Sequence, residues 1–186
     1  MDAPAHAPDP DAEAERLRRA RRGDGAAFEA LYHDHARAVH ALAFRLTGNA
    51  AEAEDIVQET FLRMFGFLSG LRENTPLRPW LKRVAANLAI DRLRRQQRPG
   101  TEMALAALAD PASASPADAA DADALLRRLP PLARTVVWLH EMEGWSHEDL
   151  GRRFGRTASW SKSLMSRSLA RLRQDLAPHG DAPHDA

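Results

Sequence analysis

The side chains best suited to chemistry in this sequence are basic, and they gather in two segments. Between residues 78 and 98 the only acid is Asp91, and between residues 151 and 173 there is no acid at all. Guanidinium and ammonium groups neutralise phosphates and release the counterions bound to them. The two segments therefore indicate a polyanionic partner that is contacted in two places.

An acidic segment separates the two basic ones, so the formal net charge is zero. Residues 99–126 hold no Lys or Arg, but they hold Glu102, Asp110, Asp118, Asp121 and Asp123. The segment is rich in Ala, Pro and Ser and has little to bury, which predicts a flexible acidic linker over residues 99–122. Similar composition predicts disordered tails at residues 1–12 and 178–186. The two blocks expected to fold are residues 13–98 and 123–177.

Enzymatic chemistry finds little support. The chain has no Cys, which excludes thiolate metal sites, Cys nucleophiles and disulfides and favours a reducing cytoplasm. His140-Glu141 begins like a zinc-protease motif, but Gly144 stands where its second histidine belongs. No phosphate-binding glycine loop or nucleophile elbow is present. We predict no catalytic residue, cofactor or metal site, with metal sensing as a weak alternative for three neighbouring histidines, His33, His35 and His40.

The elements that carry these residues are predicted to be helices, giving an all-α fold. With 186 residues, 44% hydrophobic and 6% aromatic, the chain suits two small domains better than one large core. Apolar residues recur at helical spacing over residues 28–46, and Thr47-Gly48-Asn49 ends that helix. A second helix, with acids in its first turns, runs to about Leu68. Gly and Pro mark a loop over residues 69–79.

The helix after this loop has two faces. Its first residues are Trp80, Leu81 and Lys82. On a helical wheel the core side of this helix is formed by Leu81, Val84, Ala85 and Leu88. Another side gathers Arg83, Asn87 and Arg94. The first set suits a core, and the second suits a phosphate backbone.

The sequence of the second block predicts short helices, separated by breaks at Pro130-Pro131, Gly144 and Gly155. Ser146 is a good N-cap for residues 147–154, with Asp149 at the capping-box position. Thr157 can cap the longer helix that follows. A short helix, a tight turn and a second helix with exposed Lys, Arg and Ser form a helix-turn-helix, whose second helix enters the major groove of DNA.

Most of the chain resembles a known family, the extracytoplasmic-function (group 4) sigma factors of the sigma-70 family. AEDIVQETFLRMF at residues 53–65 resembles their helix that binds the polymerase clamp. RPWLKRVAANLAIDRLRR at residues 78–95 resembles the helix that follows their loop for the promoter's minus-10 element. LRRLPPLARTVVWLHEMEGWSHEDLGRRFG at residues 126–155 resembles their C-terminal domain, which reads the minus-35 element.

The resemblance implies an alternative sigma factor with sigma domain 2 at residues 13–98 and sigma domain 4 at residues 123–177. Core polymerase would be bound by Glu54, Asp55, Ile56, Gln58, Glu59 and Leu62. The minus-10 element would be bound by Asn74, Thr75, Arg78, Trp80, Lys82, Arg83, Asn87, Arg94 and Arg95. The minus-35 element would be bound by Arg156, Thr157, Ser159, Lys162, Ser163, Ser166, Arg167 and Arg171. The implied partners are core RNA polymerase at its clamp and flap, promoter DNA and an anti-sigma factor, in a cytoplasmic response to envelope or environmental stress.

Other interpretations stay open at this point. The acidic and basic helix faces could be solvated surfaces, residues 74–76 could merely turn the chain, and Trp80 could fill the core. The linker could mimic RNA in a basic channel or act as a plain spacer. The whole chain could be a stand-alone helix-turn-helix regulator, or a sigma-like mimic that titrates a regulator.

Two residues depart from the family pattern in the predicted recognition helix. Ser161 stands where a buried Val is expected, and Leu164 stands where a basic residue is expected. The helix could therefore be rotated, or Trp160 could fill the vacated core. Each base contact through a bidentate Arg or Lys contributes about 1–3 kcal/mol of discrimination, so a lost basic residue would alter the sequence that is read.

Overall fold

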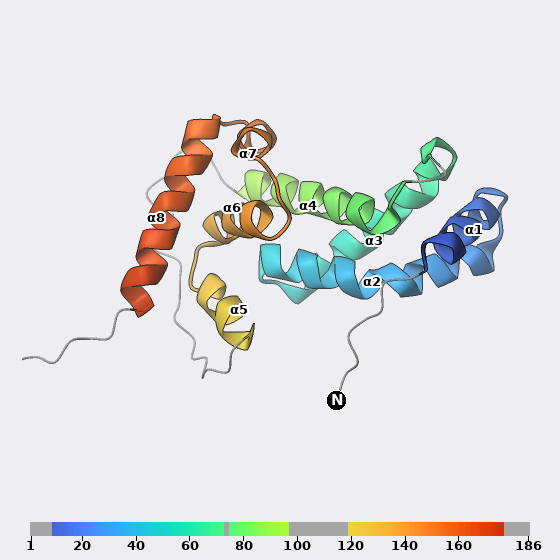
Figure 1. The fold of residues 1–186 in the computed structure, drawn as a ribbon, viewed down its shortest axis with the longest axis horizontal. Helices are drawn as coiled ribbons and strands as arrows, with labels where there is room; N and C mark the ends of the chain where they lie inside the picture. The colour runs from blue at the N-terminus through green and yellow to red at the C-terminus, as the bar shows by residue number, and fades with distance from the viewer. Residues whose placement is uncertain (1–8, 73–74, 97–118, 177–186) are drawn as a thin grey trace, which may run out of the picture. The chain divides into compact units, whose positions relative to one another are not determined.

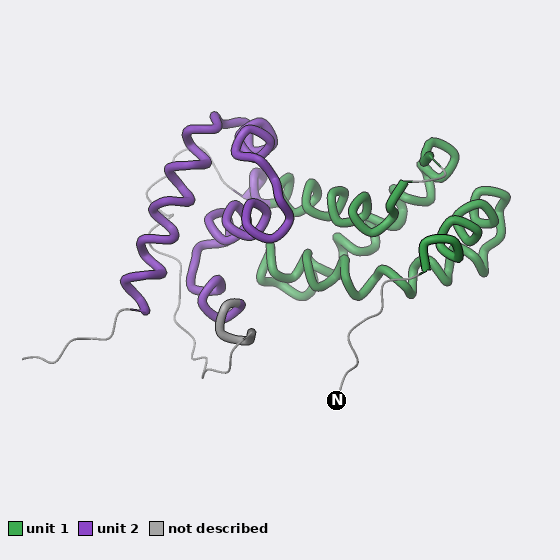
Figure 2. The backbone as a smooth tube through the Cα atoms, in the orientation of Figure 1, with its two compact units in different colours: residues 1–92 green, residues 93–186 purple. Residues whose placement is uncertain are grey.

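The computed structural model describes residues 9–72, 75–96 and 119–176. Every regular element in these ranges is helical, which confirms the predicted all-α fold. The chain divides into two compact units, residues 1–92 and 93–186 (Figure 2). Within the part that is described, no helix is both long and apolar enough to cross a membrane.

The described part of the first unit is built from helices (Figure 1). These are α1 (Pro10–Arg21), α2 (Gly25–Thr47), α3 (Ala50–Phe67), the short 3-10 helix η1 (Leu68–Gly70) and α4 (Leu77–Gln96), whose last four residues belong to the second unit. Helix α2 packs against both α1 and α3, and η1 contacts α1 and α3. Apart from His35, the largest fully buried side chains of these helices are apolar, and they include Leu31, Leu42, Leu46, Ile56, Met64, Leu81 and Ile90.

The boundary between α2 and α3 lies where the sequence predicts it. Gly48 takes a left-handed conformation with φ of 73°, which a Cβ would disfavour, and its N–H donates to the carbonyl of Phe44. The Asn49 side chain then accepts from the N–H of Glu52 and caps α3. The predicted end of the first long helix and start of the next are confirmed.

The predicted disordered tail at residues 1–12 is wrong in its last three residues. Helix α1 begins at Pro10, and the side chain of Asp9 accepts from the N–H of Asp11. Asp is a favoured N-cap, and Pro is favoured at the first helical position because its missing N–H is not needed there. The pair Asp9-Pro10 was therefore a readable start signal. Residues 1–8 lie outside the described part of the chain.

The second unit contains α5 (Ala119–Arg127), α6 (Pro131–Glu141), α7 (His147–Phe154) and α8 (Ala158–Leu176). Helix α8 packs on α6 and α7, and α5 contacts α6. The predicted breaks at Gly144 and Gly155 fall between helices, and the break at Pro130-Pro131 coincides with the start of α6 at Pro131. The predicted linker is wrong in its last four residues, because α5 already begins at Ala119, in an alanine-rich stretch that favours helix. Residues 99–118 of the predicted linker and the tail 178–186 lie outside the described residues.

The turn between α7 and α8 has the predicted caps. The hydroxyl of Ser146 accepts from the N–H of Asp149, and the hydroxyl of Thr157 accepts from the N–H of Trp160. Gly155 ends α7 in a left-handed conformation with φ of 66°. Gly151 lets the two helices approach closely, because a Cβ there would lie 2.6 Å from the backbone carbon of Thr157.

Candidate functional surfaces

Helix α3 has one face in the core and one face outside. Its buried side chains are Ala53, Ile56, Val57, Thr60, Phe61 and Met64. The other face carries Glu54, Asp55, Gln58, Glu59, Leu62 and Phe65, which we call the α3 face. All of these are exposed except the half-buried Glu59. Ile56 was predicted to contact polymerase, but its complete burial assigns it to the core instead.

The α3 face combines acids with two large apolar side chains. Leu62 is 71% exposed and Phe65 is 64% exposed. The Phe65 ring meets the Phe28 ring of α2 edge-on at 5.5 Å between centroids. Single exposed apolar residues are common, but two neighbours one turn apart on an acidic face indicate a surface that a partner covers. The sequence analysis missed Phe65, although it lies three residues after Leu62 on the same stripe.

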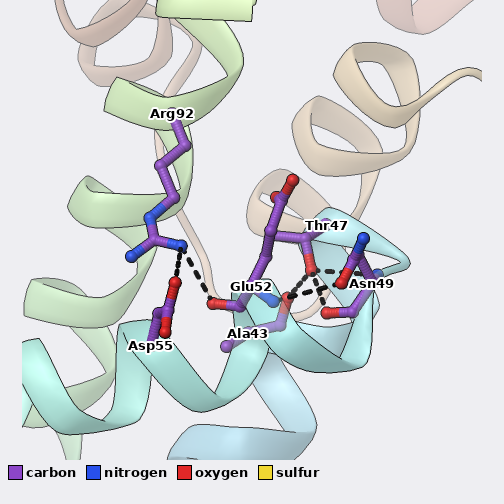
Figure 3. A network of polar contacts seen from close by, with 6 residues as sticks. All are labelled: Ala43, Thr47, Asn49, Glu52, Asp55 and Arg92. Carbon is purple, nitrogen blue, oxygen red and sulfur yellow. Dashed lines mark hydrogen bonds and ion pairs between the residues drawn. The ribbon is translucent and has the colours of Figure 1, made fainter.

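Two acids of the α3 face, Asp55 and Glu59, have intramolecular partners. The guanidinium of Arg92 in α4 lies 3.3 Å from a carboxylate oxygen of Asp55 and also donates to the carbonyl of Glu52 (Figure 3). Arg63 pairs with Glu59 at 2.7 Å. Asp55 stays 65% exposed, so solvent screens its ion pair and leaves the carboxylate accessible.

Helix α4 separates its basic residues from its core residues. Its buried positions are Leu77, Leu81, Ala85, Ala86, Leu88, Ala89, Ile90 and Leu93. Of the predicted minus-10 residues, Arg83, Arg94 and Arg95 are exposed, while Thr75, Arg78, Trp80, Lys82 and Asn87 are half-buried. Val84, which was predicted on the core side, is also half-buried. Asn74 lies outside the described residues.

Two aromatic rings lie beside the predicted minus-10 loop. Trp80 of α4 stacks on Phe67 of α3, with centroids 6.2 Å apart and planes 4° from parallel. The Phe67 ring also covers Gly70, where a Cβ would approach it to 2.8 Å. Phe67 is exposed and Trp80 is half-buried, so neither ring is a simple core plug. Phe67 was missed by the sequence analysis, because helical spacing alone does not show that it meets Trp80.

Helix α8 directs every predicted minus-35 residue outward. The exposed residues at its start and along its outer side are Arg156, Thr157, Ser159, Lys162, Ser163, Ser166, Arg167 and Arg171. The buried residues are Ser161, Leu164, Met165, Ser168 and Leu172. This periodicity leaves one continuous face of hydroxyl and basic groups for a partner.

The two departures from the expected pattern both lie on the inner side of α8. Ser161 is fully buried, and its hydroxyl lies 3.1 Å from Nδ1 of His147 in α7. Leu164 is 7% exposed and belongs to the core. Trp160 is half-buried and packs against Phe154 at 5.4 Å between ring centroids. The outer face is complete without either departing residue, so a rotated helix is not needed to explain them.

Comparison with known proteins assigns both units. The model of sigma-70 region 2 matches residues 31–99, and the model of sigma-70 region 4 matches residues 120–172. The chain belongs to the sigma-70 family. Within it, curated relatives place the chain among the extracytoplasmic-function (ECF) RNA polymerase sigma factors, and the predicted family and role as an alternative sigma factor are confirmed.

Two relatives illustrate the match. The ECF sigma factor SigE of Mycolicibacterium smegmatis is 36% identical over 170 residues, which cover 84% of this chain and 65% of SigE. The sigma factor CarQ of Myxococcus xanthus is 35% identical over 168 residues, which cover 86% of this chain and 95% of CarQ. This chain therefore spans less than two thirds of SigE but nearly all of CarQ.

A solved structure shares the fold. The sigma factor RpoE of Bartonella quintana, determined in complex with the anti-sigma factor NepR, matches with a TM-score of 0.51 and 24% identity. The match covers 77% of this sigma factor and 92% of RpoE. The region 2 match contains most of α2 and all of α3 and α4, and the region 4 match contains nearly all of α5 to α8.

Two of the described histidines, His140 and His147, lie together in the second unit. His140 donates from Nδ1 to the carbonyl of Trp145 at 2.7 Å, and its ring stacks on His147 with centroids 4.1 Å apart. Burial, His140 and Lys162 lower the pKa of His147. His33 is exposed beside Glu29, His35 is fully buried, and His40 stacks on Phe44. Among the residues described, no three potential metal ligands converge.

Proposed function

We propose that this sigma factor binds core RNA polymerase through the α3 face. The observation that carries the proposal is the outward position of Leu62 and Phe65 among Glu54, Asp55 and Gln58 on one side of a helix. Exposed apolar residues supply the burial that drives association, and the acids select a basic partner surface. A merely solvated helix would gain nothing from keeping Leu62 and Phe65 in water.

Promoter DNA is read by two further surfaces in this proposal. The α4 surface and its preceding loop take the minus-10 element, with Arg83, Arg94 and Arg95 on phosphates. The Phe67–Trp80 stack provides an aromatic wall for an unstacked base, because base stacking on aromatic rings is favourable for any base. Helix α8 enters the major groove at the minus-35 element with its outer face.

Catalysis belongs to the polymerase in this scheme, and the sigma factor acts in the cytoplasm as its promoter-reading subunit. Control by an anti-sigma factor follows from the family resemblance. It is supported by the exposed apolar side chains of Leu62, Phe65 and Met142, which such a regulator would cover. The signal is an envelope or environmental stress. The acidic segment before α5 either mimics RNA in the polymerase or serves as a spacer.

The first test is run-off transcription with the purified chain, bacterial core polymerase and a promoter library from the same genome. We expect specific transcripts and co-migration of the chain with core polymerase. Absence of both would overturn the proposal. In that case, binding to free duplex DNA would indicate a stand-alone regulator, and its absence would indicate a mimic.

A matched pair of variants tests the α3 face itself. Leu62→Asp places a charge at the centre of the face, and Leu176→Asp places the same charge at a side chain that is 60% exposed at the end of α8. We expect only Leu62→Asp to lose binding to core polymerase. Equal binding by the two variants would remove the α3 face from the contact.

A further inference from the structure

We propose that helix α1 braces the minus-10-reading segment, with Glu13 and Arg21 as positioning residues and the buried His35 holding Glu13. The segment in question comprises η1 and residues 75–80 of the described part of the chain. The inference deepens the proposed function, since it rests on the role given there to this segment. Neither α1 nor any of these three residues was part of the predicted site.

Helix α1 is bonded to both ends of the segment. Nε of Arg21 donates to the carbonyl of Leu68 at 2.9 Å, at the start of η1. The carboxylate of Glu13 accepts from the N–H of Leu77 at 3.3 Å, at the first residue of α4. The first N–H groups of a helix have no partner within it, so a carboxylate there acts as a cap. The cap comes from a residue far away in sequence, which ties α4 to α1.

His35 orients this cap. It lies in α2 with no exposed surface, and its Nε2 is 2.9 Å from the second carboxylate oxygen of Glu13. The Glu13 carboxylate, only 16% exposed, thus lies between the His35 ring of α2 and the N–H donor of Leu77 in α4. The other charged groups near His35 are Asp34 and Arg78, and Asp34 is paired with Arg16 of α1.

The same side of α1 packs into the first unit. Leu17 and Ala20 are buried at positions four and seven residues after Glu13, so they lie on the same side of the helix. The two bonds to the segment therefore come from a helix that is itself anchored. Helix α1 is therefore more than a solvated N-terminal helix, because its side chains also make polar contacts to both ends of the segment.

The functional consequence is preorganisation. Phe67, Thr75, Arg78 and Trp80 lie within or beside the braced segment, and they would contact an unstacked base and its phosphates. Binding through mobile side chains costs conformational entropy, whereas η1 and the first turn of α4, both bonded to α1, have lost part of that freedom before DNA arrives. Loss of the brace should weaken capture of the minus-10 strand and leave the α3 face and α8 unchanged.

The first arm of the test measures amide hydrogen exchange at Leu77 in the full free chain. Glu13→Ala should raise the exchange rate at Leu77 about tenfold, as expected for loss of a hydrogen bond to a charged acceptor. The control is Glu15→Ala, on the same helix, because the partners of Glu15 among the described residues are Arg18 and Arg22, within and just after α1. Unchanged exchange at Leu77 in Glu13→Ala would overturn the brace.

The second arm measures promoter opening by the reconstituted holoenzyme. We expect Glu13→Ala to reduce opening about tenfold, with core polymerase affinity and minus-35 duplex binding unchanged. Glu13→Gln keeps one carbonyl acceptor for Leu77 and should restore part of the loss, which general destabilisation would not do. Equal losses in opening, core binding and minus-35 binding would show a global defect and refute the positioning role.

Arg21→Ala provides an independent variant at the other end of the segment. Its control is Arg18→Ala, because the side chain of Arg18 bonds to Glu15 of the same helix and, in the described part of the chain, not to the segment. If Glu13→Ala does not fold, Arg21→Ala must still lower opening relative to Arg18→Ala, or the inference fails. If the proposed function is wrong, the result will differ. The wild-type chain will then form no holoenzyme, although the exchange rate at Leu77 will still rise in Glu13→Ala.

Discussion

Substitution of Gly151 tests how tightly the helix-turn-helix is built. In Gly151→Ala the new Cβ would lie 2.6 Å from the backbone carbon, 2.8 Å from the oxygen of Thr157 and 2.9 Å from the nitrogen of Ala158. Favourable carbon contacts lie at about 3.5–4.0 Å, so α7 and the start of α8 must separate by nearly 1 Å. The obstructing atoms are backbone, which cannot turn aside as a side chain would.

A second helical glycine gives the matched control. Gly66 lies in α3, where a Cβ would meet nothing within 4 Å. Both substitutions gain about 1 kcal/mol of helix propensity, so this contribution cancels between the two variants. The remaining difference is the overpacking cost at Gly151, about 1–3 kcal/mol. Gly66→Ala should stabilise its unit, and Gly151→Ala should be neutral or destabilising by up to about 2 kcal/mol.

Thermal unfolding of the full chain measures this difference. Far-UV circular dichroism follows both units, and tryptophan fluorescence follows mainly the second unit, which holds Trp138, Trp145 and Trp160. A difference of 1 kcal/mol corresponds to about 4–8 °C in the midpoint for a domain of this size. Gly151→Ala should also weaken minus-35 binding by displacing α8. An equal rise in midpoint for both variants, with minus-35 binding intact, would refute the close-approach argument.

Three further predictions concern other sites. Leu62→Asp should weaken core polymerase binding by more than about tenfold in a pull-down, while circular dichroism stays unchanged because the side chain is exposed. Ser161→Ala should destabilise the second unit by about 0.5–1.5 kcal/mol in chemical denaturation, since it removes the partner of His147. Burial lowers the pKa of both His35 and His147 in the folded chain. The unfolded chain therefore takes up protons at a higher pH than the folded chain does. The free energy of unfolding should accordingly fall as the pH drops below about 6.5. A free energy of unfolding that stays constant from pH 7.5 to 5.5 would contradict this.

Local signals predicted much of the fold. The end of α2 at Gly48, the Asn49 cap and the breaks at Pro130-Pro131 and Gly155 are each decided by one or two residues and their neighbours. Such features depend on backbone conformation and on hydrogen bonds a few residues apart, so a single sequence contains them. The same reasoning applies to Ser146, whose cap on α7 was predicted and observed.

The errors arose where composition was given more weight than local signals. Proline and acidic residues suggested a disordered tail, yet Asp9-Pro10 is a helix start. Alternating Ala and Asp suggested a linker up to residue 122, yet α5 begins at Ala119. In both places a segment of polar composition carries residues that favour a helical first turn.

Contacts between distant residues could not be predicted from spacing. Glu13, His35 and Leu77 meet because three helices pack around one point, and no periodicity within a helix contains that information. The same is true of the Phe67–Trp80 stack. The family resemblance implied which α3 residues bind polymerase, but it could not show that Ile56 is fully buried while Phe65 is left exposed.

Ser161 and Leu164 show how a departure from a family pattern can be absorbed by the core. A buried hydroxyl without a partner is unfavourable, so a Ser at an apolar position requires a nearby polar group. His147 supplies it from α7, at 3.1 Å. Leu164 adds an aliphatic side chain on the same inner side, where it needs no partner. The loss of a basic residue at this position therefore alters the packing between α7 and α8, while Lys162, Arg167 and Arg171 still face outward. Sequence preference at the minus-35 element should accordingly depend on these three side chains and not on a rotation of α8.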